Sequence, residues 1–256
     1  MIDLHCHILP GVDDGAKTME DSLDMARHAA SEGIDTIVAT PHHQNGKYVN
    51  EKSRIFEQVN ELNKRLIEEK IPVKILPGQE TRIYGQLVQD YIDGKVLTLN
   101  NTHKYLFVEL PSSQVPQFTE QLLYEIQSNG LTPIIVHPER NSRLIEQPDI
   151  LYNLVNKGAL TQVTASSLIG YFGAKVKRFS LDLIDSNLTH MFASDAHNTN
   201  KRNFHMREAS EIILKEHGEE TLGLFYENVN QIILGKSCYK NPPERVIKKK
   251  KFLGIF

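Results

Sequence analysis

Two histidines one residue apart, His5 and His7, lie in the first apolar run of the chain, and a pair of aspartates that includes Asp14 follows them. In a β-strand alternate side chains share a face, so Asp3, His5 and His7 are predicted to point to one side. The apolar residues of this run are predicted to form the opposite, buried side: Ile2, Leu4, Cys6 and Ile8. Imidazole and carboxylate groups on one face suit a divalent metal ion, although histidines are also common on the exposed face of a strand.

Side chains of the same kinds recur where later apolar runs end. They are His42, Glu80, Glu109, His137, Asp195 and His197. Taken singly, each has an ordinary explanation, such as Glu80 capping a helix or Asp195 lying in a turn. Burying several carboxylates together without cations would cost several kcal/mol each, however. The coincidence therefore predicts a metal centre built from His5, His7, Asp14 and these residues.

The elements that must position these side chains follow a regular alternation. The predicted strands cover residues 2–7, 35–43, 73–80, 105–110, 132–139, 159–166 and 189–197. The predicted helices cover residues 18–33, 51–70, 115–130, 148–158 and 174–187, and the last third of the chain is also predicted to be helical. Thr18 and Asp21 have the spacing of a capping box, and Gly33 lies where a helix would end.

This alternation predicts an α/β fold with parallel strands, because apolar runs such as TPIIVH suit strands that are buried on both faces. At this length it favours a TIM-like (β/α) barrel, in which the carboxyl ends of all strands meet at one face. An open, doubly wound sheet is the alternative. No glycine-rich phosphate loop follows the first predicted strand, which argues against the usual nucleotide-binding versions of that sheet.

Composition limits the classes of protein to consider. The chain has 256 residues, a net charge of −3 and two cysteines, Cys6 and Cys238. The mixed charges give no indication of nucleic-acid binding, and so few cysteines fit a reducing compartment. No apolar run reaches the length of about 18 residues that indicates a membrane span, and no signal peptide is evident. We therefore expect a cytoplasmic protein without an integral membrane segment.

A single domain is predicted over residues 1–240, followed by a tail over residues 241–256. The tail is basic and partly apolar, and it contains the four consecutive lysines Lys248–Lys251. Contact with an acidic partner or a membrane surface is one interpretation of this tail. A solvated tail is the interpretation that we favour.

The types of ligand narrow the choice of metal. Imidazoles and carboxylates without thiolates suit manganese, iron or zinc, and the residues alone do not choose among them. The predicted ligands are too many for one tetrahedral ion and would serve about two to three divalent ions per chain. The positive charge that remains on about three such ions favours an anionic substrate, of which phosphate is the first candidate.

The order of the motifs HxH, a following Asp, TPHH, GQE, VEL, HPER and SDAH resembles the PHP (polymerase and histidinol phosphatase) family of metal-dependent hydrolases. The resemblance runs from residue 1 to about residue 240 and implies a distorted (β/α)7 barrel. The segments MIDLHCHILPGVDDGAKT, ATPHHQNGKY, PGQETRIYG and SDAHNTNKRNFHM are most similar to the PHP-class protein tyrosine phosphatases of Gram-positive bacteria. Those enzymes dephosphorylate the bacterial tyrosine kinases that control capsule and exopolysaccharide synthesis.

The resemblance also implies how the ligands are shared among the ions, with Mn²⁺ as the first choice and iron or zinc as alternatives. One ion would be held by His5, His7, Glu80 and Asp195. A second would be held by Glu80, Glu109 and His137, and a third by Asp14, His42 and His197, so that Glu80 bridges two ions.

Two arginines follow predicted ligands closely and are expected at the mouth of the same pocket. Arg140 lies three residues after His137, and Arg202 lies five residues after His197. A planar guanidinium can bind phosphate oxygens in a bidentate manner, and the resemblance assigns phosphate binding to both. The neighbouring Arg207, His43 and His205 are expected to lie close by without binding metal.

The nucleophile is expected to be water. A cysteine phosphatase needs an arginine six residues after its cysteine, and neither Cys6 nor Cys238 has one. Divalent cations can generate a reactive water near neutral pH, and His42 or His197 could assist proton transfer if not bound to metal. The resemblance implies that the substrates are a tyrosine-phosphorylated kinase and the proteins that it phosphorylates. The alternatives are a phosphatase for a small molecule such as histidinol phosphate, a phosphodiesterase, and a non-catalytic module that docks on the kinase.

Overall fold

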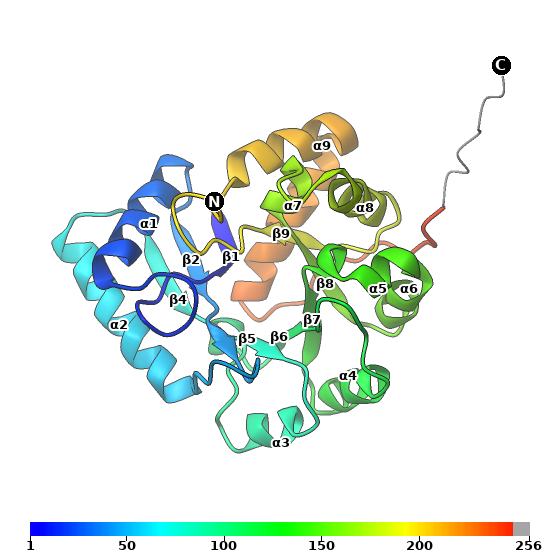
Figure 1. Ribbon diagram of the computed structural model, residues 1–256, viewed down its shortest axis with the longest axis horizontal. Coiled ribbons are helices and arrows are strands. Elements are labelled where there is room, and N and C mark those ends of the chain that lie inside the picture. The colour runs from blue at the N-terminus through cyan, green and yellow to red at the C-terminus, as the bar shows by residue number, and fades with distance from the viewer. Residues whose placement is uncertain (248–256) are drawn as a thin grey trace.

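Parallel strands enclosed by helices form the body of the computed structural model, which describes residues 1–247 (Figure 1). One sheet has the order β1 (Ile2–Cys6), β2 (Thr36–Ala39), β4 (Lys74–Pro77). The other has the order β3 (His42–His43), β5 (Glu80–Arg82), β6 (Tyr105–Glu109), β7 (Thr132–Val136), β8 (Leu160–Thr164), β9 (Met191–Ala193). All of these strands pair in parallel, which confirms the predicted α/β class.

Two strands predicted as continuous are each divided between the two sheets. The predicted strand 35–43 is broken after Ala39 into β2 and β3, and the predicted strand 73–80 is broken after Pro77 into β4 and β5. Pro41 has no N–H for a strand ladder, and a Cβ at Gly78 would lie 2.7 Å from Val38 Cγ1. The prediction of unbroken strands is therefore wrong at these points. Beyond the breaks, His42 pairs directly with Glu80.

The first strand also meets the segment that follows the last one. Cys6 and Ala196 form an isolated parallel bridge. The N–H of Asp195 donates to the carbonyl of His5 at 2.8 Å, and the N–H of His7 donates to the carbonyl of Ala196 at 2.8 Å. Predicted ligands from the two ends of the strand order are thereby brought side by side.

The predicted alternation along β1 holds for His5 and His7, whose Nε2 atoms lie 3.3 Å apart. It is wrong for the apolar residues, which are divided where the register of β1 against β2 shifts between Asp3 and Cys6. Leu4 packs in an apolar group with Val38, Phe107 and Ile134, which we call the inner cluster. Cys6 packs in a larger apolar group with Ile8 and Leu23, which we call the outer cluster. His5 follows Leu4 directly and also lies against Phe107, with the ring centroids 5.1 Å apart. Asp3 instead accepts hydrogen bonds from the N–H and Oγ of Ser194. An irregularity of this kind re-aims the side chains that follow it.

The longer helices lie within their predicted ranges. They are α1 (Met19–Ser31), α2 (Lys52–Glu68), α4 (Thr119–Ser128), α6 (Pro148–Asn156) and α8 (Ala174–Asp185). The capping box is confirmed, since Asp21 N–H donates to Thr18 Oγ1 and Thr18 N–H donates to the Asp21 carboxylate. Gly33 follows α1 with φ of 86°, a conformation that favours glycine.

Several short helices were not predicted, because so few residues show no helical periodicity. They are α3 (Leu87–Ile92), α5 (Ser142–Glu146), α7 (Ala165–Ile169) and the 3₁₀ turns η1 (Leu99–Asn101) and η2 (Pro138–Arg140). Both η2 and α7 follow strand ends directly. They therefore shape the loops around the carboxyl end of the sheet.

The last helix, α9 (Met206–Ile233), is broken at Gly218, where φ is 85° and ψ is 173°. Its second half crosses behind the strands in Figure 1, and Val229 and Ile232 pack into the inner cluster. The chain beyond it also contacts the body, since Arg245 pairs with Asp149 at 2.7 Å. The lysine-rich tail from residue 248 lies outside the described residues. None of the helices within residues 1–247 is both long and apolar enough to cross a membrane.

Candidate metal centre

All predicted ligands gather at the carboxyl end of the strands, in what we call the cluster: His5, His7, Asp14, His42, Glu80, Glu109, His137, Asp195 and His197. Glu80 lies at its centre and is buried. Its Oε2 lies 3.6 Å from His5 Nε2, 3.3 Å from His7 Nε2 and 2.7 Å from His42 Nδ1. Its Oε1 lies 2.7 Å from His137 Nε2. One carboxylate therefore contacts four imidazoles.

Two members of the cluster take up left-handed backbone conformations just past their strands. These are His137 after β7, with φ of 37°, and Asp195 after β9, with φ of 55°. Such conformations cost energy for residues other than glycine and occur often at functional sites. Asp195 Oδ1 lies 3.5 Å from His5 Nε2 and 3.2 Å from His7 Nε2.

Asp14 and Glu109 are the remaining carboxylates of the cluster. Asp14 Oδ1 lies 3.3 Å from His42 Nε2 and 3.5 Å from His197 Nε2. Glu109 Oε2 lies 3.8 Å from His42 Nδ1, and Arg82 holds the other oxygen of Glu109 at 3.2 Å. His42 therefore lies between three carboxylates, those of Asp14, Glu80 and Glu109.

Three groups within the cluster have ligand atoms that all lie within 4.8 Å of one another. They are His7, Asp14, His42 and His197; His5, His7 and Glu80; and His42, Glu80 and Glu109. The first and second groups contain most of the residues that the resemblance assigns to two of the ions. The third pairs Glu80 and Glu109 with His42, where the resemblance has His137. The geometry thus brings the predicted residues together and divides them differently around Glu109.

Some buried ligand atoms of the cluster make no hydrogen bond, which fits a cationic occupant. Glu109 Oε2 and His197 Nε2 are buried without a hydrogen-bond partner. Leaving such groups desolvated and unpaired is costly, and more so for a charged oxygen. Oxygen and imidazole nitrogen are also the donor types that manganese, iron and zinc accept. The donor set, with its atoms that lack a hydrogen bond, therefore suits divalent ions.

Two residues that orient the histidines were missed by sequence reasoning. Asp13 Oδ2 lies 2.7 Å from His7 Nδ1, and Gln162 Oε1 lies 2.8 Å from His5 Nδ1. Each holds one ring nitrogen so that the other points into the cluster, as partners of metal-binding histidines commonly do. The aspartate pair at residues 13–14 was the only signal for Asp13, and nothing marked Gln162. Gly15 is also needed here, since a Cβ would lie 2.0 Å from the carbonyl of His7.

Charges within the cluster lower the pKa of Glu80 and raise the pKa values of His42 and Glu109. Burial favours protonation of Glu80, but the charges of His42 and His5 outweigh it and hold the pKa of this carboxyl well below its usual range. Burial disfavours charge on His42, yet Glu80 raises the pKa of His42 to about 10. Burial and Glu80 together raise the pKa of Glu109 to about 7. A metal ion would compete with these protons, because its ligands bind in deprotonated form.

Two other imidazoles are held neutral. Burial, with Arg140 nearby, lowers the pKa of His137 to about 3. Burial, with His7 nearby, lowers the pKa of His197 to about 4. Both rings are therefore uncharged near neutral pH, which is the form in which histidine binds a metal ion.

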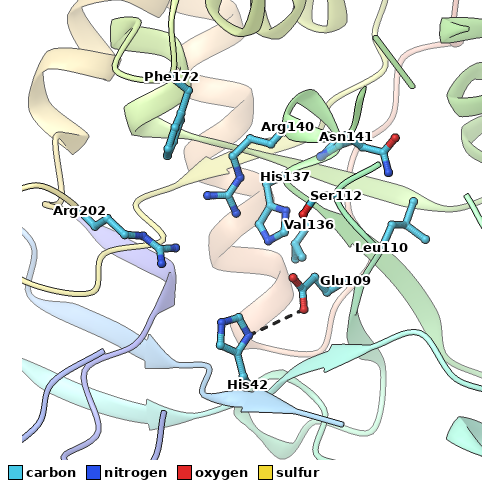
Figure 2. Close-up of a pocket in the computed structure, with 11 residues that line it drawn as sticks. His42, Glu109, Leu110, Ser112, Val136, His137, Arg140, Asn141, Phe172 and Arg202 are labelled. Carbon is cyan, nitrogen blue, oxygen red and sulfur yellow. Dashed lines mark ion pairs between the residues drawn. The ribbon is translucent and has the colours of Figure 1, made fainter. Parts of the chain in front are cut away.

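A cavity of about 390 Å³ opens beside the cluster, with His42, Glu109 and His137 among its lining residues. Arg140 from η2 and Arg202 from the loop before α9 project into it, as Figure 2 shows. Both reach the same carboxylate oxygen, Asp195 Oδ2, at 2.7 Å from Arg140 Nη1 and 3.1 Å from Arg202 Nη2. The arginines therefore lie at the predicted pocket, and they also contact a predicted metal ligand, which the sequence did not indicate.

The other basic residues expected nearby lie outside the cluster. Arg207 donates to the carbonyl of Ser31 at 2.8 Å, and the N–H of His205 donates to Glu32. Both therefore fix the start of α9 against the end of α1. His43 packs against the ring of Tyr84 on the other side of its strand.

Several curated proteins are similar to this chain over most or all of its length. Tyrosine-protein phosphatase YwqE of Bacillus subtilis is 49% identical over 256 residues, which cover 100% of both chains. The putative tyrosine-protein phosphatase CapC of Staphylococcus aureus is 39% identical, also over 100% of both chains. Tyrosine-protein phosphatase CpsB of Streptococcus pneumoniae is 30% identical over 91% of this chain and 98% of its own.

Solved structures are also similar to this chain. A chain from the work on YwqE of Bacillus subtilis and CpsB of Streptococcus pneumoniae, described as unique metal-dependent tyrosine phosphatases, matches with a TM-score of 0.94 and 49% identity. The match covers 97% of this chain and 100% of that one. The phosphotriesterase homology protein of Escherichia coli matches at a TM-score of 0.56 with 10% identity, which shows a shared fold only. Residues 1–234 match the family described as "Capsular polysaccharide synthesis, CpsB/CapC", and the chain belongs to this CpsB/CapC family.

Proposed function

We propose that this chain is a metal-dependent phosphatase that hydrolyses phosphotyrosine in proteins. The observation that carries the proposal is that Arg140 and Arg202 share one cavity with the cluster. Guanidinium groups bind phosphate oxygens in a bidentate manner, so a phosphoryl group in this cavity would lie between the arginines and the cluster. Tyrosine-protein phosphatase is the name of the relative that is 49% identical over the full chain, and it supplies the choice of phosphotyrosine.

The ligands proposed for the ions are the members of the cluster. His5, His7, Glu80 and Asp195 would hold one ion, with Glu80 shared. Asp14, His42 and His197 would hold another, and Glu109 with His137 would complete a third. We infer about two to three ions, with manganese first and iron or zinc as alternatives. Divalent ions there would polarise the phosphoryl oxygens and lower the pKa of a water molecule so that it attacks phosphorus near neutral pH.

The side chains of the chain itself have separate tasks in this reaction. Arg140 and Arg202 bind the phosphoryl oxygens and stabilise the charge that gathers on them in the transition state. His42 or His197 would transfer a proton wherever its ring nitrogen is not bound to metal. The phenolate of tyrosine is a good leaving group, so the need for a strong general acid is small.

A cysteine nucleophile does not fit the geometry. Cys6 is fully buried in the outer apolar cluster, and Cys238 lies in the segment after α9 beside Asn228. Neither lines the cavity that holds the arginines. Attack by water is therefore the chemistry that we propose.

The finer fold that we propose is one distorted seven-stranded (β/α) barrel of the PHP type. The pairs β2–β3 and β4–β5 would each count as one bent strand. The bridge between Cys6 of the first strand and Ala196, in the segment that follows the last strand, supports closure of this ring. A single domain over residues 1–240 remains our proposal for the domain organisation.

The proposed substrates are a tyrosine-phosphorylated bacterial kinase and the proteins that it phosphorylates, in the regulation of capsular or exopolysaccharide synthesis. The description of the family as capsular polysaccharide synthesis supports this setting. We place the reaction in the cytoplasm, where the free thiols of Cys6 and Cys238 would stay reduced. No nucleic-acid partner is proposed.

A metal-reconstituted assay tests the proposed function. Chelator-treated protein is supplied with Mn²⁺, and hydrolysis of a phosphotyrosine peptide is compared with hydrolysis of the matching phosphoserine peptide and of histidinol phosphate. We expect kcat/KM to be highest for the phosphotyrosine peptide. A preference for histidinol phosphate would favour a small-molecule phosphatase, and no hydrolysis of any substrate would favour a docking module.

A further inference from the structure

The cavity beside the cluster has an apolar part as well as a charged one. Leu110, Val136, Pro138 and Phe172 contribute to its lining. Leu110 and Val136 are buried in the body, with 5% and 1% of their surface exposed. Phe172 is only half-buried, and in Figure 2 its ring points toward the space between the two arginines. It supplies the one phenyl ring that lines the cavity within residues 1–247.

The ring of Phe172 is held from two sides. Arg140 Cζ lies 5.3 Å from the ring centroid, and the Tyr171 ring meets it edge-on at 5.2 Å and 87°. The short loop that carries both aromatic residues is bounded by Gly170 and Gly173, with φ of 93° and 92°. These left-handed conformations favour glycine and allow a tight turn between α7 and α8.

A buried carboxylate fixes this loop relative to the arginine. Glu139 Oε1 accepts hydrogen bonds from the N–H of Thr164 at 2.9 Å and from Ser167 Oγ at 2.7 Å. Glu139 directly precedes Arg140, and Ser167 lies in α7, which leads into the loop of Phe172. The guanidinium and the phenyl ring are thus positioned by one hydrogen-bonded unit rather than by two independent loops.

We propose that Phe172 is a specificity-determining residue, which packs against the phenyl ring of phosphotyrosine and so selects aryl over alkyl phosphate monoesters. This inference rests on the proposed function. With the phosphoryl group between the arginines and the cluster, the ester substituent points away from the charged groups and along the apolar lining. Aromatic pairs contribute stabilisation beyond their buried area, and phosphoserine has no ring to form one.

The experiment compares wild type and Phe172→Leu on three probes: a phosphotyrosine peptide, the matching phosphoserine peptide, and inorganic phosphate as an inhibitor. We expect kcat/KM for the phosphotyrosine peptide to fall about tenfold in the variant, mainly through KM. The value for the phosphoserine peptide and the Ki of inorganic phosphate should change by less than about twofold, because the arginines remain. Phe172→Tyr, which keeps the ring, should restore the preference.

Phe118→Leu is the matched control, since Phe118 is 43% exposed at the start of α4 and does not line the cavity. An equal loss on all three probes would overturn the inference, because it would mean that Phe172 only holds Arg140. An unchanged phosphotyrosine activity in F172L would also overturn it while leaving the proposed function intact. If metal-loaded wild type does not hydrolyse the phosphotyrosine peptide, the proposed function itself fails.

Discussion

Arg140 Nη1 lies 2.7 Å from Asp195 Oδ2, while Oδ1 of the same carboxylate lies 3.2 Å from His7 Nε2. One aspartate thus joins a phosphate-binding candidate to the metal-binding candidates. Burial of Asp195 favours its protonated form, but Arg140 and His5 outweigh this and hold its pKa well below its usual range. The carboxylate therefore stays ionised and presents one oxygen to each group.

Replacement of Arg140 tests this division of labour. We expect Arg140→Ala to lower kcat/KM for a phosphotyrosine peptide by about two orders of magnitude, the scale of one lost charge-stabilising donor. Bound metal should be retained, since Arg202 still pairs with Asp195 Oδ2 and Oδ1 still faces His7. Arg143→Ala, on the exposed side of α5, is the control and should keep wild-type activity. Loss of metal in step with activity would show that Arg140 mainly holds Asp195.

Asp13 offers a test of ligand orientation. Asp13→Asn should weaken Mn²⁺ binding by about tenfold to a hundredfold, because the carboxylate that accepts from His7 Nδ1 is lost. The affinity is measured by calorimetric titration of chelator-treated protein with Mn²⁺. Asp24→Asn serves as the control, because Asp24 is exposed on α1 and pairs with Arg27. Equal affinities in D13N and D24N would contradict the role assigned to Asp13.

Removal of metal should affect both activity and stability. We expect chelation to abolish phosphatase activity and Mn²⁺ to restore it, with elemental analysis giving about two to three ions per chain. The melting temperature should rise on reconstitution, because ions that bind only the folded state stabilise it. Full activity in excess chelator, together with the absence of metal after gentle purification, would rule out the proposed centre.

The parts of the site that the sequence predicts are those placed by strand ends. His5, His42, Glu80, Glu109 and His137 each end a predicted strand, and parallel strands bring their carboxyl ends to one face. The position of these residues therefore follows from topology alone. Their division among ions does not, since His42 approaches Glu80 and Glu109 only after the break between β2 and β3.

Features set by tertiary contact were not predictable. The register shift after Asp3 moves Leu4 to the inner cluster, although the apolar pattern of β1 alternates regularly. Gln162 is an ordinary polar residue in the sequence, and only the pairing of β8 with its neighbours places it beside His5. Arg140 was expected at the pocket from its distance to His137, but its contact with Asp195 depends on the fold of η2.

A histidine remote from the cluster should make stability depend on pH. His190 is buried before β9, where its Nδ1 accepts from the N–H of Thr161. Burial, and then Lys240, lower the pKa of His190 from 6.5 to about 3. Between these two pKa values the unfolded chain binds more protons at His190 than the folded chain does. The contribution of His190 to the free energy of unfolding is therefore fully present above about pH 6.5 and is lost as the pH falls toward 3.

The measurement for His190 is urea unfolding of chelator-treated protein between pH 7 and 4. The free energy of unfolding should fall more steeply with acid in wild type than in His190→Asn, which cannot take up this proton. Chelation in both samples removes any contribution from metal release. Parallel curves for the two proteins would show that His190 does not titrate differently on folding.

The nucleophile is tested first by substitution. Cys6→Ser and Cys238→Ser should each keep most of the activity, because neither thiol lines the cavity. Glu80→Ala should remove nearly all activity, since Glu80 contacts four of the imidazoles. Cys6 is fully buried, so its variant must be compared as folded protein at a temperature below its melting transition.

The stereochemical course at phosphorus gives the decisive test. Direct attack by water is a single displacement, so a phosphorothioate analogue of phosphotyrosine, made chiral with oxygen-16 and oxygen-18 and hydrolysed in oxygen-17 water, should yield thiophosphate of inverted configuration. Transfer through Cys6, Cys238 or a histidine would need two displacements and would retain the configuration. Rapid acid quench in a single turnover should accordingly trap no phosphoenzyme. Retention, or a phosphorylated cysteine or histidine in the quenched protein, would overturn attack by water even if Mn²⁺ proved essential.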